Sequence, residues 1–151
     1  MSTRSRIGLT RPNGSIISIY CHSDGYLEGP HGVGHTLLNH YQDRKKITAL
    51  IKLGDISCLQ EHVAPPVGVE HSYDHDKLAP NVTVAYMRDR GETGCGAQIH
   101  KNVDEFLTFD SGQEYSYLFA SATGWTVWAH DAPTRLLGPL ATAHVTERLT
   151  A

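Results

Sequence analysis

The chain has 151 residues, of which 40% are apolar and 19% are charged, and its formal net charge is -3. This length suits one domain with a buried core, and without a basic field we expect no nonspecific DNA binding. No apolar run approaches the roughly 20 residues that a spanning helix needs, and the polar start lacks the apolar segment of a signal peptide, so we expect a cytoplasmic protein with no membrane association.

The first predicted element is a β-hairpin over residues 6–22. Its two strands flank the sequence RPNG at 11–14, in which proline and Asn-Gly favour a tight turn. Because side chains alternate along a strand, Tyr20 and His22 should lie on the face opposite the core. The predicted core face of the return strand consists of Ile17, Ile19 and Cys21.

Helices and a long loop are predicted next. A short helix spans 36–41, and a second helix at 44–53 has Asp43 as its N-cap. Asp55 is predicted to begin one more helical turn. Residues 61–80 lack periodicity, which in a compact domain is typical of a functional or mobile loop.

The second half of the chain adds a strand at 82–87, a helix from Asn102 to Phe109 and a hairpin with strands at 115–119 and 125–128. The resulting fold class is α+β: an antiparallel sheet of hairpin, single strand and hairpin, with two to three helices packed on one face. Residues 1–151 form a single domain in this interpretation. Its core is 6–130, and 131–151 are a C-terminal tail that contributes an edge strand or an oligomer contact.

The densest group of polar and aromatic residues is the sequence GSIISIYCHSDGYLEGPHGVGHTLLNHY at 14–41. It passes from a strand through a glycine-rich loop into a helix start, where backbone N–H groups can hold an anion. The alternative is a tight loop whose glycines only relieve steric crowding. The candidate ligand-binding residues of this segment are Tyr20, His22, Asp24, Tyr26, His35 and Thr36.

Two further candidates, Arg88 and Arg90, follow the predicted strand at 82–87. On an extended chain both guanidinium groups would project the same way and could clamp a phosphate or carboxylate. The alternative is that Asp89 and Glu92 hold them in surface ion pairs.

Metal and nucleophile sites were considered and not assigned. The ten histidines include His71 and His75 in HSYDHD, but no helical pattern surrounds this segment and HExxH is absent. Cys21 and His22 are strand neighbours that point to opposite faces, and Cys95 lies between glycines that suit a plain turn. The three cysteines lack CxxC spacing and suit reduced thiols. We therefore predict no catalytic residue, no metal and no cofactor.

Motifs over most of residues 6–128 resemble a family of small phage- and prophage-encoded proteins of unsettled function. That family has an opening of the type RIG…NGS…SIYCHxDGY, then an L…HY helix, a LGDIS-like turn, an AYxRDRGE segment and a late YSYLF…W hairpin. This chain departs from the pattern in the loop at 27–31 and in its long tail after His130. The matching segments are Arg6–Gly8, Asn13–Tyr26, Leu37–Tyr41, Leu53–Ser57, Ala85–Glu92 and Tyr115–Trp125.

The resemblance implies a phage accessory protein that acts against host defences in the host cytoplasm. The leading hypothesis is sequestration of a small anionic nucleotide immune signal without turnover. Arg88, Arg90 and the helix start at 32–36 would meet its phosphates, while Tyr20 or Tyr26 would stack on its base. Enclosing the ligand favours a homo-oligomer. Two alternatives stay open: a metal- or histidine-dependent phosphodiesterase using His22, Asp24 and a loop histidine, and an inhibitor that binds a host defence protein directly.

Overall fold

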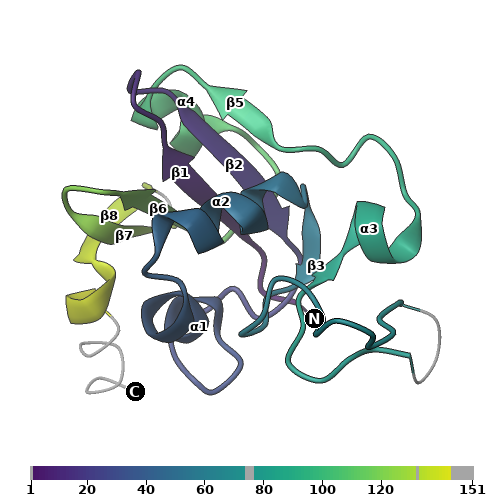
Figure 1. Ribbon diagram of the computed structural model, residues 1–151. Coiled ribbons are helices and arrows are strands. Elements are labelled where there is room, and N and C mark those ends of the chain that lie inside the picture. Colours follow the sequence, from purple (N-terminus) through teal and green to yellow (C-terminus); the bar gives the residue numbers. More distant parts are fainter. Residues whose placement is uncertain (1, 74–76, 132, 144–151) are drawn as a thin grey trace.

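A computed structural model describes residues 2–73, 77–131 and 133–143 of the chain (Figure 1). It is an α+β fold built around one large sheet. The elements in chain order are β1 (Ser5–Thr10), β2 (Ile16–Cys21), α1 (Val33–His40), α2 (Arg44–Lys52), β3 (Ile56–Cys58), β4 (Val84–Ala85), α3 (Tyr86–Arg90), β5 (Gln98–His100), α4 (Val103–Thr108), β6 (Tyr115–Ala120), β7 (Gly124–Ala129) and β8 (Arg135–Pro139).

The sheet is mixed, with the strand order β4-β3-β2-β1-β6-β7-β8, and β5 pairs with one end of β2. Both predicted hairpins are confirmed, since β1 pairs antiparallel with β2 and β6 with β7. The wholly antiparallel sheet is wrong, because β1 runs parallel to β6 and β2 runs parallel to β3. Parallel neighbours are joined by long crossovers, which leave no turn signal between the paired segments.

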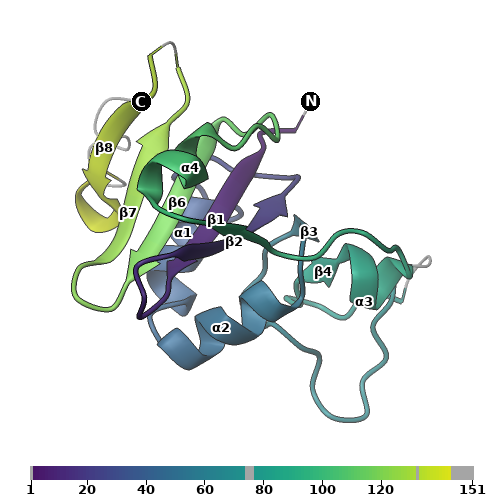
Figure 2. The same cartoon turned by 90° about the horizontal axis from the view of Figure 1, so that it is seen from above.

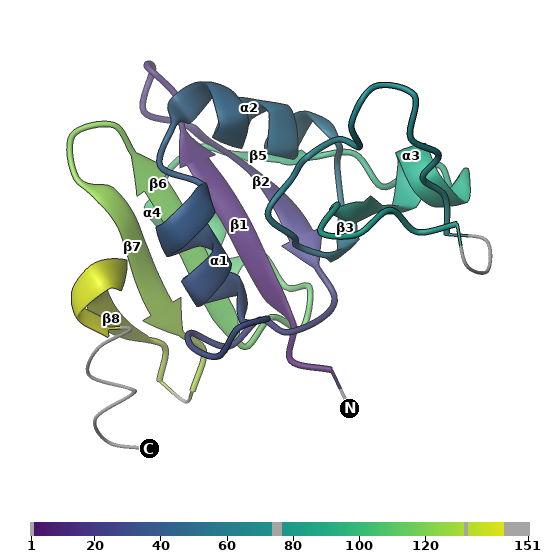
Figure 3. The ribbon, with the colours of Figure 1, turned by 60° about the horizontal axis from the view of Figure 1, so that its bottom comes forward.

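Helices cover both faces of the sheet, so the prediction of helices on one face is also wrong. Helices α1 and α2 pack on the face that carries Ile7, Ile19 and Tyr117 (Figure 3). Helix α4 lies on the other face (Figure 2), where Phe106 packs with Ile16 and Leu118 in a smaller cluster. The reason is visible in β2, whose buried Ile16 stands on the face opposite Ile17 and Ile19 and needs its own cover.

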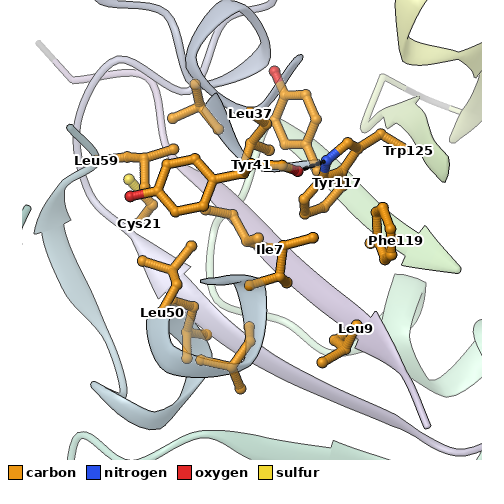
Figure 4. Packing of buried hydrophobic residues seen from close by; sticks show 14 of the residues in the cluster. Ile7, Leu9, Cys21, Leu37, Tyr41, Leu50, Leu59, Tyr117, Phe119 and Trp125 are labelled. Atoms are coloured by element: carbon orange, nitrogen blue, oxygen red, sulfur yellow. Dashed lines mark hydrogen bonds between the residues drawn. The ribbon is translucent and has the colours of Figure 1, made fainter. Parts of the chain in front are cut away.

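The larger core contains three hydrogen bonds from aromatic side chains to backbone carbonyl groups. Trp125 Nε1 donates to Tyr41 O at 2.7 Å, as Figure 4 shows. Tyr41 Oη in turn donates to Gln60 O at 2.7 Å, and Tyr117 Oη donates to Gly25 O at 2.7 Å. These bonds let large aromatic groups be buried without leaving a polar atom unpaired, and they tie connecting segments to the sheet.

The predicted N-caps of helices α2 and α4 are confirmed. Asp43 accepts from Lys45 N–H at the start of α2, and Asn102 accepts from Glu105 N–H at the start of α4. The helical turn predicted at Asp55 is wrong, because the chain continues as β3. Strand β5 was not predicted.

The strand predicted over 82–87 is wrong beyond Ala85. There the chain turns into helix α3, because the Asp89 carboxylate accepts from Ala85 N–H at 2.7 Å and so closes the first turn. Gly91, with φ of 70°, ends the helix in the left-handed conformation that glycine adopts readily. Among the described residues, no helix combines the length and apolar character needed to cross a bilayer.

Candidate functional site

The end of strand β2 and the residues that follow β4 lie close together at one edge of the sheet. Cys21, Ile56 and Ala85 are register partners across β2, β3 and β4 and face the core. Tyr20 therefore projects from the other face. Its backbone N–H donates to Asp55 Oδ1 at 2.9 Å, and Tyr86 N–H donates to Asp55 O at 3.2 Å. Asp55 thus joins the two tyrosine backbones.

Arg90 belongs to the same group of side chains. Its guanidinium carbon lies 5.0 Å from the ring centre of Tyr86 and 4.4 Å from that of Tyr73, as in cation–π contacts. Its Nε donates to the half-exposed carboxylate of Glu92 at 2.9 Å. The group Tyr20, His22, Asp55, Tyr73, Tyr86 and Arg90 is called the edge site below.

Arg88 does not point the same way as Arg90, because the two lie on a helix and not on an extended segment. Its guanidinium donates to both carboxylate oxygens of Asp89 and to the carbonyl oxygens of Val63 and Thr83. These four bonds hold the Arg88 side chain against Asp89 and the segment that precedes β4. The predicted two-arginine clamp is therefore not formed, and Asp89 and Glu92 pair with the arginines instead.

The residues after β2 are linked in two pairs. His22 is exposed, and its Nδ1 lies 2.9 Å from Tyr20 Oη. Tyr26 Oη donates to Asp24 Oδ1 at 3.0 Å. Only the first pair adjoins Asp55, so the structure brings Tyr20 and His22 into the edge site and gives Asp24 and Tyr26 a local contact of their own.

The start of α1 does not present free donors to an anion. Val33 N–H donates to Asp24 O and Gly34 N–H donates to Tyr26 O, at 2.7 and 3.2 Å. A Cβ at Gly34 would lie 2.5 Å from Leu27 O, so the loop backbone needs glycine there for its close approach. His35 and Thr36 follow on α1, which covers the face opposite Tyr20, and Thr36 is buried. Neither reaches the edge site.

The pKa values of Asp55, Tyr20 and Tyr86 in the edge site are raised, which favours the neutral form of each side chain. Burial raises the pKa of Asp55, while the hydrogen bond from Tyr20 N–H and the charge of Arg6 oppose the shift. Burial also raises the pKa of Tyr20 and of Tyr86, and each tyrosine feels a nearby arginine that lowers it. Tyr86 is itself among the groups that raise the pKa of Tyr20, which places the two side chains in one electrostatic environment.

Sequence reasoning missed Asp55, Tyr73 and Tyr86 as members of this group. Asp55 was assigned to a helix and Tyr86 to a strand, and their proximity to Tyr20 depends on the parallel β2–β3 pairing. No local pattern signals that pairing.

A second cluster of polar side chains is buried beneath α4, on the same face of the sheet as the edge site. Arg6 is 2% exposed and forms no salt bridge with any described residue. Its Nε donates to Ser18 Oγ at 3.0 Å and its Nη1 donates to Ser111 Oγ at 3.1 Å. Ser18 Oγ lies 2.7 Å from His100 Nε2. Ser18 Oγ therefore links the buried guanidinium of Arg6 to the ring of His100.

Stability should fall with pH through the two histidines on this face. Burial lowers the pKa of His100, and the charge of Arg6 lowers it further, while the charge of Glu105 raises it. Burial also lowers the pKa of His130, while the charge of Asp131 raises it. The unfolded state then binds more protons than the folded state below a pH of about 6.5, the ordinary histidine pKa. The free energy of unfolding is therefore unaffected by these histidines above that pH and decreases below it. Urea unfolding from pH 8 to 5 measures this. The double variant H100Q/H130Q should show a shallower decline, and an unchanged decline would contradict the assignment.

The structure places Cys21 where its thiol is poorly suited to act as a nucleophile. Cys21 is buried, and burial raises the pKa of its thiol to about 12, so the reactive thiolate is disfavoured. No three His, Cys, Asp or Glu side chains of the described chain converge as metal ligands. The HSYDHD hypothesis rests partly on residues 74–76, which lie outside the described residues.

Comparison with protein-family models, with curated proteins and with solved structures finds no match for this chain.

Proposed function

We propose that the protein captures a small anionic nucleotide-like ligand at the edge site and retains it without turnover. The observation that carries this proposal is the grouping of Tyr20 and Tyr86 with a stacked, partly exposed guanidinium, that of Arg90. Together with the phage resemblance, it favours a counter-defence role in the host cytoplasm, in which the bound ligand is a nucleotide immune signal.

The chemistry of the edge site suits a phosphate next to an aromatic base. Arg90 is already oriented by two aromatic rings, so binding a phosphate costs it little additional side-chain entropy. Glu92 is the one carboxylate paired with Arg90 among the described residues, and it is 42% exposed. A bidentate phosphate can displace such a weak surface partner. The rings of Tyr20 and Tyr73 then offer faces on which a base can stack.

A homo-oligomer remains part of this proposal. Tyr73 and His22 are exposed and Arg90 is partly exposed in the single chain, so the edge site is open. A ligand that must be withheld from a sensor needs burial on most of its surface. A second copy of the chain over the edge site would provide that cover.

The direct test is mass spectrometry of small molecules released by denaturing the purified protein after exposure to extract from defence-active cells. The wild type should release an intact nucleotide, and R90A should retain less than about a tenth of it, from the loss of one charge-assisted contact. R135A is the matched control. Arg135 also pairs with an exposed carboxylate, that of Asp131 at 2.9 Å, but it lies on β8 at the other end of the sheet.

Two outcomes would replace this proposal. An altered nucleotide would favour the phosphodiesterase alternative with His22 and Asp24. No nucleotide, but a host protein retained by the wild type, would favour the inhibitor alternative. The observation behind the inhibitor is the loop at 61–80, which exposes apolar side chains to solvent. These are Val67, Val69, Tyr73 and Leu78.

A further inference from the structure

A cavity of about 330 Å³ lies between α2 and the β1–β2 hairpin, on the face of the sheet opposite the edge site. Its volume is within the range of sites for small organic ligands. The lining residues are Leu9, Arg11, Pro12, Ile17, Arg44, Thr48, Ile51, Lys52 and Ala97.

The floor of this cavity is apolar and continuous with the main core. Leu9 and Ile51 are buried members of the core, and Ile17 and Ala97 pack against it. Ala97, which also lines the cavity, immediately precedes β5, and β5 pairs with β2 at Ile16–Ser18. Binding of an apolar group to this preformed floor would remove apolar surface from water, which is favourable.

The rim of the cavity carries three cations and no lining carboxylate. Arg11 donates to Ser15 Oγ, and Arg44 donates to Thr10 O and Ser121 Oγ, which are neutral partners. Among the described residues, neither arginine forms a salt bridge, and neither does the exposed Lys52. Asp43, in the neighbouring groove along α2, accepts from Lys45 N–H as the helix N-cap. None of the three rim cations is thus paired with a carboxylate at salt-bridge distance in the described part of the chain.

We propose that this cavity is a second binding site, which takes a small amphipathic monoanion. Its apolar chain or ring lies on the floor made by Leu9, Ile17 and Ile51, and its carboxylate or comparable group meets Lys52 and Arg44 at the rim. The site is independent of the edge site, because the two lie on opposite faces of the sheet.

Octanoate is the probe for this site, with octanol and octyltrimethylammonium as matched ligands of neutral and positive charge. In amide NMR titrations, octanoate should give saturable shifts at Ile17, Ile51 and Ala97. Octanol should bind about tenfold more weakly, since it lacks a charge-assisted contact. The cationic ligand should give no saturable shift.

Variants separate charge from shape. K52A removes an exposed side chain, so it should fold normally and bind octanoate about tenfold more weakly. K45A is the matched control and should bind like the wild type, because Lys45 lines only the neighbouring groove. A97L should fill the floor and abolish binding while keeping the wild-type amide spectrum elsewhere. Equal binding of octanoate and octanol, or octanoate shifts that do not saturate, would overturn the proposal.

Discussion

The variant D89A is expected to unfold at a lower urea concentration than the wild type, with a loss of about 3 kcal/mol in the free energy of unfolding. The Asp89 side chain is 2% exposed, and its carboxylate accepts from Arg88 Nε at 2.8 Å, Arg88 Nη2 at 2.9 Å and Ala85 N–H at 2.7 Å. Removing it leaves a charged guanidinium and the first turn of α3 without their main acceptor.

The same carboxylate also holds the long loop. His71 Nε2 lies 3.4 Å from Asp89 Oδ2 and 3.1 Å from Thr83 O, while His71 Nδ1 accepts from Ala79 N–H at 2.9 Å. Arg88 adds a bond to Val63 O at 2.6 Å. Hydrogen exchange should therefore accelerate most at Ala79 and Ala85, before global unfolding.

A surface carboxylate on the same turn is the control for D89A. Glu92 pairs with Arg90 near solvent, so E92A should change stability by about 0.5 kcal/mol or less. The Asp89 carboxylate should also make the free energy of unfolding decrease at acidic pH. Burial alone would raise its pKa, but the bonds from Arg88 and Ala85 together with the Arg88 charge lower it. Its contribution is present above the ordinary pKa of about 3.9 and is lost as the pH falls through the lower folded value. A D89A variant as stable as E92A would refute this account.

Local patterns were sufficient for about half of the fold, namely the elements that depend on neighbouring residues. The RPNG turn, the Asp43 cap and the Asn102 cap each act over four residues or fewer, and all three were predicted. The β1–β6 and β2–β3 pairings join distant segments in parallel, and their register depends on the whole core. Helix α3 was missed because the strand-like segment ends at Ala85, whose N–H donates to the buried Asp89 carboxylate four residues later in the chain.

The candidate site shows the same division between local and long-range determinants. Alternation along β2 correctly placed Tyr20 opposite Ile19, which is a property of any strand. The expected orientation of Arg88 and Arg90 depended on an extended backbone, and it failed with the helix. Asp55 and Tyr86 became neighbours of Tyr20 through the sheet register, which no single segment encodes.

The buried Arg6 leads to the second large effect, seen in a double-mutant cycle. S18A should lose about 3 kcal/mol of stability, because it removes the acceptor of Arg6 Nε and the hydroxyl that is hydrogen-bonded to His100 Nε2 inside the protein. R6M should change stability by less than about 1 kcal/mol. An apolar side chain of similar length avoids the desolvation of a charge that has no carboxylate partner.

In the double variant R6M/S18A the loss should shrink to about 1 kcal/mol, a coupling energy of about 2 kcal/mol between the two side chains. Ser116 supplies the control for losing a buried serine that contacts a histidine, because it is equally buried and its Oγ lies 2.6 Å from His130 Nε2. It lies on β6 and is the register partner of Arg6 on β1. S116A should cost about 1 kcal/mol and couple to R6M more weakly than S18A does, because the side-chain hydroxyl groups that accept from Arg6 are those of Ser18 and Ser111. Urea unfolding monitored by tryptophan fluorescence measures S18A, R6M, S116A and the double variants R6M/S18A and R6M/S116A. Additive losses for R6M and S18A would mean that Ser18 does not compensate the buried charge, and a large loss in R6M alone would mean that the guanidinium itself is needed to hold β1, β2 and the 109–113 segment together.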